Sequence, residues 1–267
     1  MLLGPECGEA SPILDQTQRP EIVAIVAFFV GRAFEQVKRR RNLGHFRTLV
    51  GRDRDAGIKI VFPSNRDAKP DGDMQLENAV SMSLAEGAAI ARLIQALRDV
   101  RPTASIRLAE SHDFADDGRP FISVGGPSVN RVSAQLIERF CPGFQVDNSL
   151  HTATFEAVSY SAAVRLKNLT RDFGFILSGH TEKGTRFAVI FGITPFGANI
   201  AARAYIGLKT LSHEHRRLVA GHRMLFITSA DVDGYGLAVF SVSNTRVVGV
   251  QDLAGIADRP RATSAPD

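Results

Sequence analysis

The chain contains 267 residues, and its 44% hydrophobic and 22% charged residues are proportions typical of a globular protein rather than a disordered one. The formal net charge is only +4. The chain has no Trp and 7% aromatic residues, so a surface that stacks nucleic-acid bases is not expected. Its two cysteines, Cys7 and Cys141, indicate no disulfide framework and no paired metal ligands, which suits a reducing compartment.

The N-terminal region divides by composition into three segments. Residues 1–19 are rich in Gly, Pro, Ser and acidic residues and are predicted to be a mobile tail. Residues 20–41 are predicted to form an apolar helix that begins at a proline. The helix ends in a basic run, which consists of Lys38, Arg39, Arg40 and Arg41. Residues 42–57 are polar and basic and are predicted to be a linker or a short helix.

Two interpretations of the apolar helix stay open. In the first, it packs on the domain or joins two copies of the chain as a homo-oligomer. In the second, it anchors the chain in a membrane, with the basic run at an anionic cytoplasmic surface. The apolar core, residues 22–30, is shorter than the roughly 20 residues that a span needs. We therefore expect a cytoplasmic protein whose association with a membrane would depend on residues 20–41.

Residues 58–257 carry the alternation of strands and helices that is typical of an α/β domain. Predicted strands cover residues 58–63, 105–109, 121–124, 144–146, 222–227 and 236–242, with a hairpin formed by residues 173–179 and 186–193. Predicted helices cover residues 78–100, 131–140 and 200–208. Residues 258–267 are predicted to be a disordered tail. The pattern predicts a three-layer sandwich with a mostly parallel sheet and one antiparallel hairpin.

The loop at residues 125–130, Gly-Gly-Pro-Ser-Val-Asn, joins a buried strand to a helix. Such a turn directs backbone N–H groups and a helix N-terminus at one point, which suits a phosphate or another anion. With the strand at 144–146 and Asp147 after it, the layout resembles a Rossmann-type nucleotide site. The resemblance implies a Rossmann-like fold over residues 58 to 242. The loop departs from the G-x-G-x-x-G pattern, and Pro127 removes one N–H donor.

In a parallel sheet, ligands bind outside the carboxyl ends of the strands. The polar and glycine residues that follow the predicted strands are therefore the candidate ligand-binding residues. They are Ser64, Asn65, Gly125, Gly126, Ser128, Asn130, Asp147, Thr194, Gly197 and Asn199. For Gly197 the sequence equally allows tight packing of the helix on the sheet.

Glu110 and His112 are the candidate catalytic residues, because a histidine beside carboxylates can act as a general base. Glu86 follows Ser83 by three residues, which predicts a helix-capping box rather than a catalytic role. His180, at the hairpin tip, is expected on the edge of the sheet opposite to the site. No metal-binding motif occurs, and the sequence identifies no cofactor.

These features predict a module that binds a nucleotide or another anionic small molecule, with a sensing or regulatory role. One alternative is a hydrolase that cleaves a nucleotide or a glycosidic bond with the same loops, using Glu110, His112, Asp67 or Asp147 as acid or base. A second alternative is a membrane-tethered interaction protein that has no small-molecule site.

Overall fold

The computed structural model describes residues 43–50, 57–64, 82–165, 168–208, 212–235 and 239–253. The predicted apolar helix, its basic run, both predicted tails and Asn65 lie outside these residues. Among the described helices, none is both long and apolar enough to cross a membrane.

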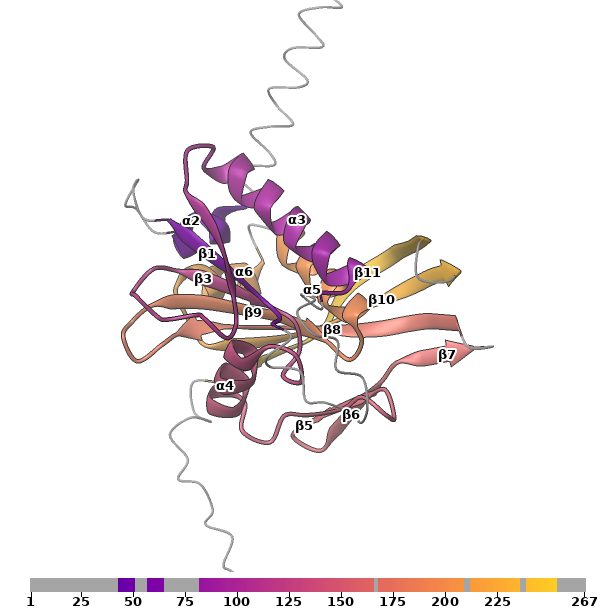
Figure 1. Cartoon of the computed structure of the whole chain (residues 1–267). Helices are drawn as coiled ribbons and strands as arrows, with labels where there is room; N and C mark the ends of the chain where they lie inside the picture. Colours follow the sequence, from indigo (N-terminus) through magenta and orange to yellow (C-terminus); the bar gives the residue numbers. More distant parts are fainter. Residues whose placement is uncertain are drawn as a thin grey trace, which may run out of the picture. The chain divides into compact units, whose positions relative to one another are not determined.

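A mixed sheet of eight strands forms the centre of the described residues, as Figure 1 shows. Its parallel half consists of β2 (Ile106–Glu110), β1 (Ile58–Phe62), β3 (Phe121–Val124) and β9 (Arg186–Gly192), in that order. Its antiparallel half continues from β9 with β8 (Asn168–His180), β10 (Met224–Tyr235) and β11 (Val239–Asp252). A short strand, β7 (Ala163–Arg165), also pairs with β8. The predicted hairpin of β8 and β9 is confirmed.

The prediction of a mostly parallel, Rossmann-like sheet is wrong. Four strands, β7, β8, β10 and β11, join the sheet only through antiparallel pairs. The parallel βαβ unit predicted around residues 125–130 is also wrong. Its second strand, β4 (Gln145–Asp147), instead forms a separate antiparallel sheet with β5 (Thr152–Phe155) and β6 (Val158–Ser161). The three residues of β4 are exposed or half-buried and only Val146 is apolar, so β4 lacks the continuous apolar run of a central parallel strand.

Apolar side chains on both faces of the large sheet explain how it is covered. In β9, Ala188 and Ile190 face one core, while Phe187, Val189 and Phe191 face the other. The first core is closed by α2 (Gly44–Val50), α3 (Leu84–Val100) and α5 (Pro195–Ile206). The second is closed by α4 (Arg131–Phe140) and the small sheet, which lie on the opposite side in Figure 1. A further short helix, α6 (His213–Val219), precedes β10.

Close packing of α5 on the sheet depends on glycines. A Cβ atom added to Gly197, in the first turn of α5, would lie 2.2 Å from the carbonyl oxygen of Phe173 in β8. A Cβ atom added to Gly192, at the end of β9, would lie 2.3 Å from the Cα atom of Gly197. Both distances are too short for real atoms, so the absence of a side chain lets the helix reach the sheet. Gly197 therefore serves helix–sheet packing, one of its two predicted roles.

Candidate functional site

The parallel half of the sheet places four strand ends at one edge. The carboxyl ends of β1, β2, β3 and β9 point the same way because these strands are parallel. At the end of β1, the Ser64 hydroxyl donates a hydrogen bond to Glu110 Oε2 at the end of β2, over 3.0 Å. The helices α4 and α5 begin just after β3 and β9, at the same edge. The described loops of the predicted site thus meet at one end of the sheet.

A cavity of about 520 Å³ lies at this edge. Four segments line it: the N-terminus of α3, residues 126–129 after β3, parts of residues 146–151, and the connection from β9 into α5. Its apolar lining includes Met82, Pro127, Val129, Val146, Ile193 and Pro195. Its polar side chains are Ser83, Glu86, Ser128, Asn148, His151 and Thr194. None of the described residues that line the cavity is Lys or Arg.

Glu86 is the carboxylic acid of this cavity, and the capping box predicted for it is confirmed. Its Oε2 atom accepts hydrogen bonds from the backbone N–H of Ser83 at 3.1 Å and from the Ser83 hydroxyl at 2.9 Å. The side chain is only 5% exposed. Burial raises the pKa of Glu86, and the two hydrogen bonds from Ser83 oppose that shift. Glu86 therefore combines a structural role with a place in the cavity wall.

Asn130 caps α4 from within the protein and is completely buried. Its Oδ1 atom accepts hydrogen bonds from the backbone N–H of Ser133 and from the hydroxyl of Ser123. Its Nδ2 atom donates to the carbonyl oxygen of Val124 at 2.8 Å. The side chain thus satisfies part of the helix N-terminus that the sequence suggested for an anion.

Asp172 of β8 occupies the N-terminus of α5 and is fully buried. Its Oδ2 atom accepts a 2.6 Å hydrogen bond from the Thr194 hydroxyl, and its Oδ1 atom accepts one from the backbone N–H of Phe173 at 2.8 Å. The backbone N–H groups of Thr194 and Gly197 also point to this carboxylate. A carboxylate at a helix N-terminus satisfies the dipole and the unpaired N–H groups. The chain's own carboxylate therefore fills the anion position that the sequence suggested for this helix.

The pKa of Asp172 makes stability depend on pH. Burial raises this pKa to about 7, against the hydrogen bonds from Thr194, Phe173 and Gly197 that lower it. Between the ordinary pKa of 3.8 and about 7, the folded state holds a proton that the unfolded state has released. In that window the Asp172 contribution to the free energy of unfolding falls as pH rises, by about 1.4 kcal/mol per pH unit.

We therefore expect wild type and Asp172→Asn to differ in their pH dependence. Urea denaturation of both proteins from pH 3.5 to pH 8 gives two stability curves. Their difference removes the contribution of the histidines, which both proteins share. The wild-type curve should fall relative to the variant curve from about pH 4 to pH 7, and the difference should be constant outside that window. Parallel curves throughout would contradict the raised pKa.

The cavity contains some of the predicted ligand-binding residues and not others. Gly126, Ser128 and Thr194 line it. Gly125 is buried behind it with φ +109°, and a Cβ atom there would lie 2.7 Å from Cγ of Pro63. Asn199 is buried within α5. Asp147 is exposed and accepts hydrogen bonds from Ser149 and Leu150 in a turn, which lower its pKa.

The two predicted catalytic residues lie outside the cavity lining. Glu110 is half-buried and bonded to Ser64, whereas His112 is exposed. The residues that the sequence did not suggest for the site include Met82, Val146 and His151. In the sequence, Glu86 was the residue that could have predicted part of the cavity wall. A capping box uses one carboxylate oxygen and leaves the other available.

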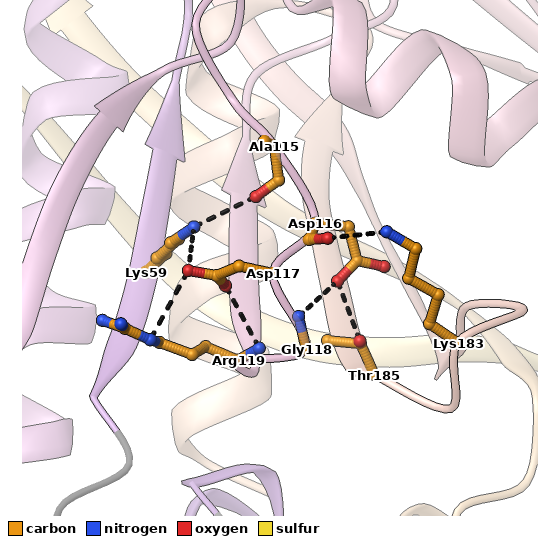
Figure 2. Close-up of polar contacts among 8 residues, drawn as sticks. All are labelled: Lys59, Ala115, Asp116, Asp117, Gly118, Arg119, Lys183 and Thr185. Atoms are coloured by element: carbon orange, nitrogen blue, oxygen red, sulfur yellow. Dashed lines mark hydrogen bonds and ion pairs between the residues drawn. The ribbon is translucent and has the colours of Figure 1, made fainter.

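The opposite edge of the sheet carries a separate polar cluster, which Figure 2 shows. Asp117 lies between Lys59 and Arg119, with 2.9 Å between its Oδ2 atom and Lys59 Nζ, and the hydrogen bond from Lys59 lowers the Asp117 pKa. Asp116 accepts a 2.8 Å hydrogen bond from the Thr185 hydroxyl, and Lys183 donates to its carbonyl oxygen. The hydrogen bonds of Asp116 connect the β2–β3 loop to the tip of the β8–β9 hairpin.

His180 pairs with the first residue of β9, next to this cluster, so its prediction on the opposite edge is confirmed. It lines a second cavity of only about 30 Å³, together with His45, Ser178 and His222. That volume holds no more than a few water molecules. Within the described residues, no group of His, Cys, Asp and Glu side chains is arranged to hold a metal ion.

The larger cavity is therefore the candidate functional site: it has the volume of a small-molecule pocket, mostly apolar walls, one buried carboxyl group and no lysine or arginine among its described lining residues. Comparisons of the whole chain with protein-family models, with curated proteins and with solved structures give no match.

Proposed function

We propose that this domain binds an uncharged small molecule of nucleoside size in the cavity at the carboxyl end of the parallel strands. The observation that carries the proposal is the cavity itself, whose volume of about 520 Å³ lies within the range of roughly 300–1,000 Å³ for ligand sites. Apolar side chains such as Met82, Val129 and Ile193 suit the faces of a flat ring. Hydroxyl, amide and carboxyl groups on the same walls suit the hydroxyls of a sugar.

The charge of the cavity favours an uncharged ligand over a phosphate ester. The described lining offers no Lys or Arg, and Glu86 would repel an anion when it is ionised. Two helix N-termini at this edge, of α4 and α5, already have internal caps in Asn130 and Asp172. A phosphate would therefore have to displace favourable internal contacts. The sequence led us to expect a nucleotide or another anion as the ligand. The charge of the cavity instead favours the uncharged part of such a molecule.

A hydrolase that uses Glu110 and His112 has less support, because neither side chain lines the cavity. The membrane-tethered alternative depends on residues 20–41, which lie outside the described residues.

A substitution that fills the cavity tests the proposal. A Cβ atom added to Gly126 would have as its nearest neighbour the carbonyl oxygen of Gly192, 3.9 Å away, so this position has room for a side chain at the cavity wall. We expect Gly126→Phe to fold and to lose at least tenfold in affinity for the nucleoside that binds wild type most tightly. The affinities of adenosine, guanosine, cytidine and uridine are measured by ligand-observed NMR and calorimetry, with AMP as the charged comparison.

Gln135→Phe is the matched control, since Gln135 is exposed on α4 and does not line the cavity. It should bind nucleosides like wild type. Failure of all four nucleosides to bind wild type would contradict the proposal. Equal binding by wild type and folded Gly126→Phe would place the ligand elsewhere and contradict it as well.

A further inference from the structure

We infer that Glu86 determines ligand choice in the cavity: its Oε1 atom accepts a hydrogen bond from a hydroxyl or N–H group of an uncharged ligand. The inference rests on the proposed function and names the group that the site recognises. It assigns a second task to a residue whose sequence position indicates only a helix cap.

The two oxygens of Glu86 have different surroundings. Oε2 accepts both hydrogen bonds from Ser83, which close the capping box of α3. Oε1 lies against Gly125, where an added Cβ atom would be 3.3 Å away. Within the described residues, no donor forms a hydrogen bond to Oε1, although the side chain is 95% buried. Oε1 does not belong to the fully buried polar atoms that lack a partner, so water reaches it from the cavity, and a ligand donor would replace that water.

The capping box also fixes the direction of Oε1. Two hydrogen bonds to Oε2 and the packing around a nearly buried side chain hold the carboxyl group in one orientation before any ligand enters. A group held in place in this way loses little conformational freedom on binding, so its hydrogen bond contributes more fully to affinity. Such a site rejects an analogue that lacks the matching donor more strongly than an apolar wall rejects a change of shape.

The neighbouring charges determine which ligands can use this acceptor. Among the described residues that line the cavity, the titratable side chains are Glu86 and His151, and His151 is exposed. A ligand carboxylate or phosphate beside Glu86 would meet like charge with no lysine or arginine from the described lining to balance it. An uncharged donor avoids this repulsion. A nucleoside offers two kinds of uncharged donor, the hydroxyls of the sugar and the N–H groups of the base.

Glu86→Gln separates the acceptor from the helix cap. Glutamine also closes a capping box, with its carbonyl oxygen accepting from Ser83, and its NH₂ group then replaces Oε1 at the cavity. We expect the variant to fold with nearly wild-type thermal stability and to lose at least tenfold in affinity for the nucleoside that binds wild type. Glu138→Gln, at an exposed position of α4 outside the cavity lining, is the matched control and should bind like wild type.

Ligand analogues show which donor Glu86 recognises. If adenosine binds, 2′,3′-dideoxyadenosine removes the 2′- and 3′-hydroxyls, 5′-deoxyadenosine removes the 5′-hydroxyl, and purine riboside removes the amino group of the base. The analogue that lacks the recognised donor should bind wild type about as weakly as adenosine binds Glu86→Gln, and the substitution should not weaken it further. For another nucleoside, the corresponding dideoxy and base-modified analogues serve the same purpose.

The outcomes distinguish this inference from the proposed function. One result is a nucleoside that binds wild type, loses its affinity in Gly126→Phe and keeps its affinity in Glu86→Gln. That result would support the cavity as the binding site and refute the role of Glu86. If no nucleoside binds wild type, the proposed function fails and the inference fails with it. If Glu86→Gln does not fold, Glu86→Asp is measured in its place. Its shorter side chain withdraws the carboxylate from the ligand, so unchanged affinity in Glu86→Asp would also refute the role.

Discussion

Gly174→Ala is expected to destabilise the domain strongly. A Cβ atom on Gly174 would lie 2.1 Å from the carbonyl oxygen of Gly197 and 2.8 Å from the backbone nitrogen of Ala201. Both contacts are with the backbone of α5, which cannot rotate away as a side chain would. The helix would have to move off the sheet, and we expect a loss of about 3 kcal/mol or more in the free energy of unfolding. That is a large part of the roughly 5–15 kcal/mol that stabilises a typical domain.

Urea denaturation followed by circular dichroism measures this effect. Gly126→Ala is the matched control, because the nearest atom to its added Cβ would be 3.9 Å away. It should shift the urea midpoint little in either direction. A Gly174→Ala protein with the midpoint of Gly126→Ala would mean that α5 does not lie as close to β8 as the structure has it.

Asp172→Ala is expected to lose about 3 kcal/mol of stability at pH 5. The substitution leaves the Thr194 hydroxyl and the N–H groups of Phe173, Thr194 and Gly197 without their acceptor. The donors of Thr194 and Gly197 are at the start of α5 and that of Phe173 is in β8, and the Asp172 side chain that they meet is fully buried. Each buried donor that loses its partner costs about 1–3 kcal/mol, although such costs are not additive.

Thermal denaturation and hydrogen exchange both report this change. We expect the melting temperature to fall by several degrees, and the amides at the start of α5 to exchange faster than those of α4. Asp231→Ala is the control, because Asp231 forms its hydrogen bond with Asn244 near the surface. Its melting temperature should stay close to the wild-type value. Unchanged exchange in α5 of Asp172→Ala would show that the Asp172 carboxyl group does not cap this helix.

The sequence predicted local elements better than their pairing. The helix α4 was predicted over its observed range, because Asn130 before it and the Cys141-Pro142-Gly143 stop after it are local signals. The strands β3 and β9 were also predicted close to their observed bounds, whereas β8 begins five residues before its predicted start at residue 173. Strand direction was predicted poorly for β10 and β11, because an apolar run such as residues 224–227, which is buried on both faces of the sheet, suits either direction. Pairing depends on contacts between residues distant in the sequence.

The sequence predicted the edge of the sheet at which the candidate site lies, but not all the residues that form the cavity walls. Parallel strands share an edge, and this placed Gly126, Ser128 and Thr194 correctly at one end of the sheet. The sequence could not show that Asp172, next to Arg171 in the polar N-terminal part of β8, turns inward to cap α5. It also could not show that His151 reaches the cavity, because β4 and the turn after it belong to a different sheet from the one predicted.

The central claim is that the cavity at the carboxyl end of the parallel strands binds an uncharged small molecule. Titration of the isotope-labelled full chain with adenosine, guanosine, cytidine or uridine, followed by two-dimensional NMR of the backbone amides, tests it most directly. We predict that at least one nucleoside shifts the amides of Gly126, Val129 and Gly192, which line the cavity, while that of Lys183 at the opposite edge keeps its position. Shifts confined to the opposite edge, or no shifts with any nucleoside at millimolar concentration, would contradict the claim.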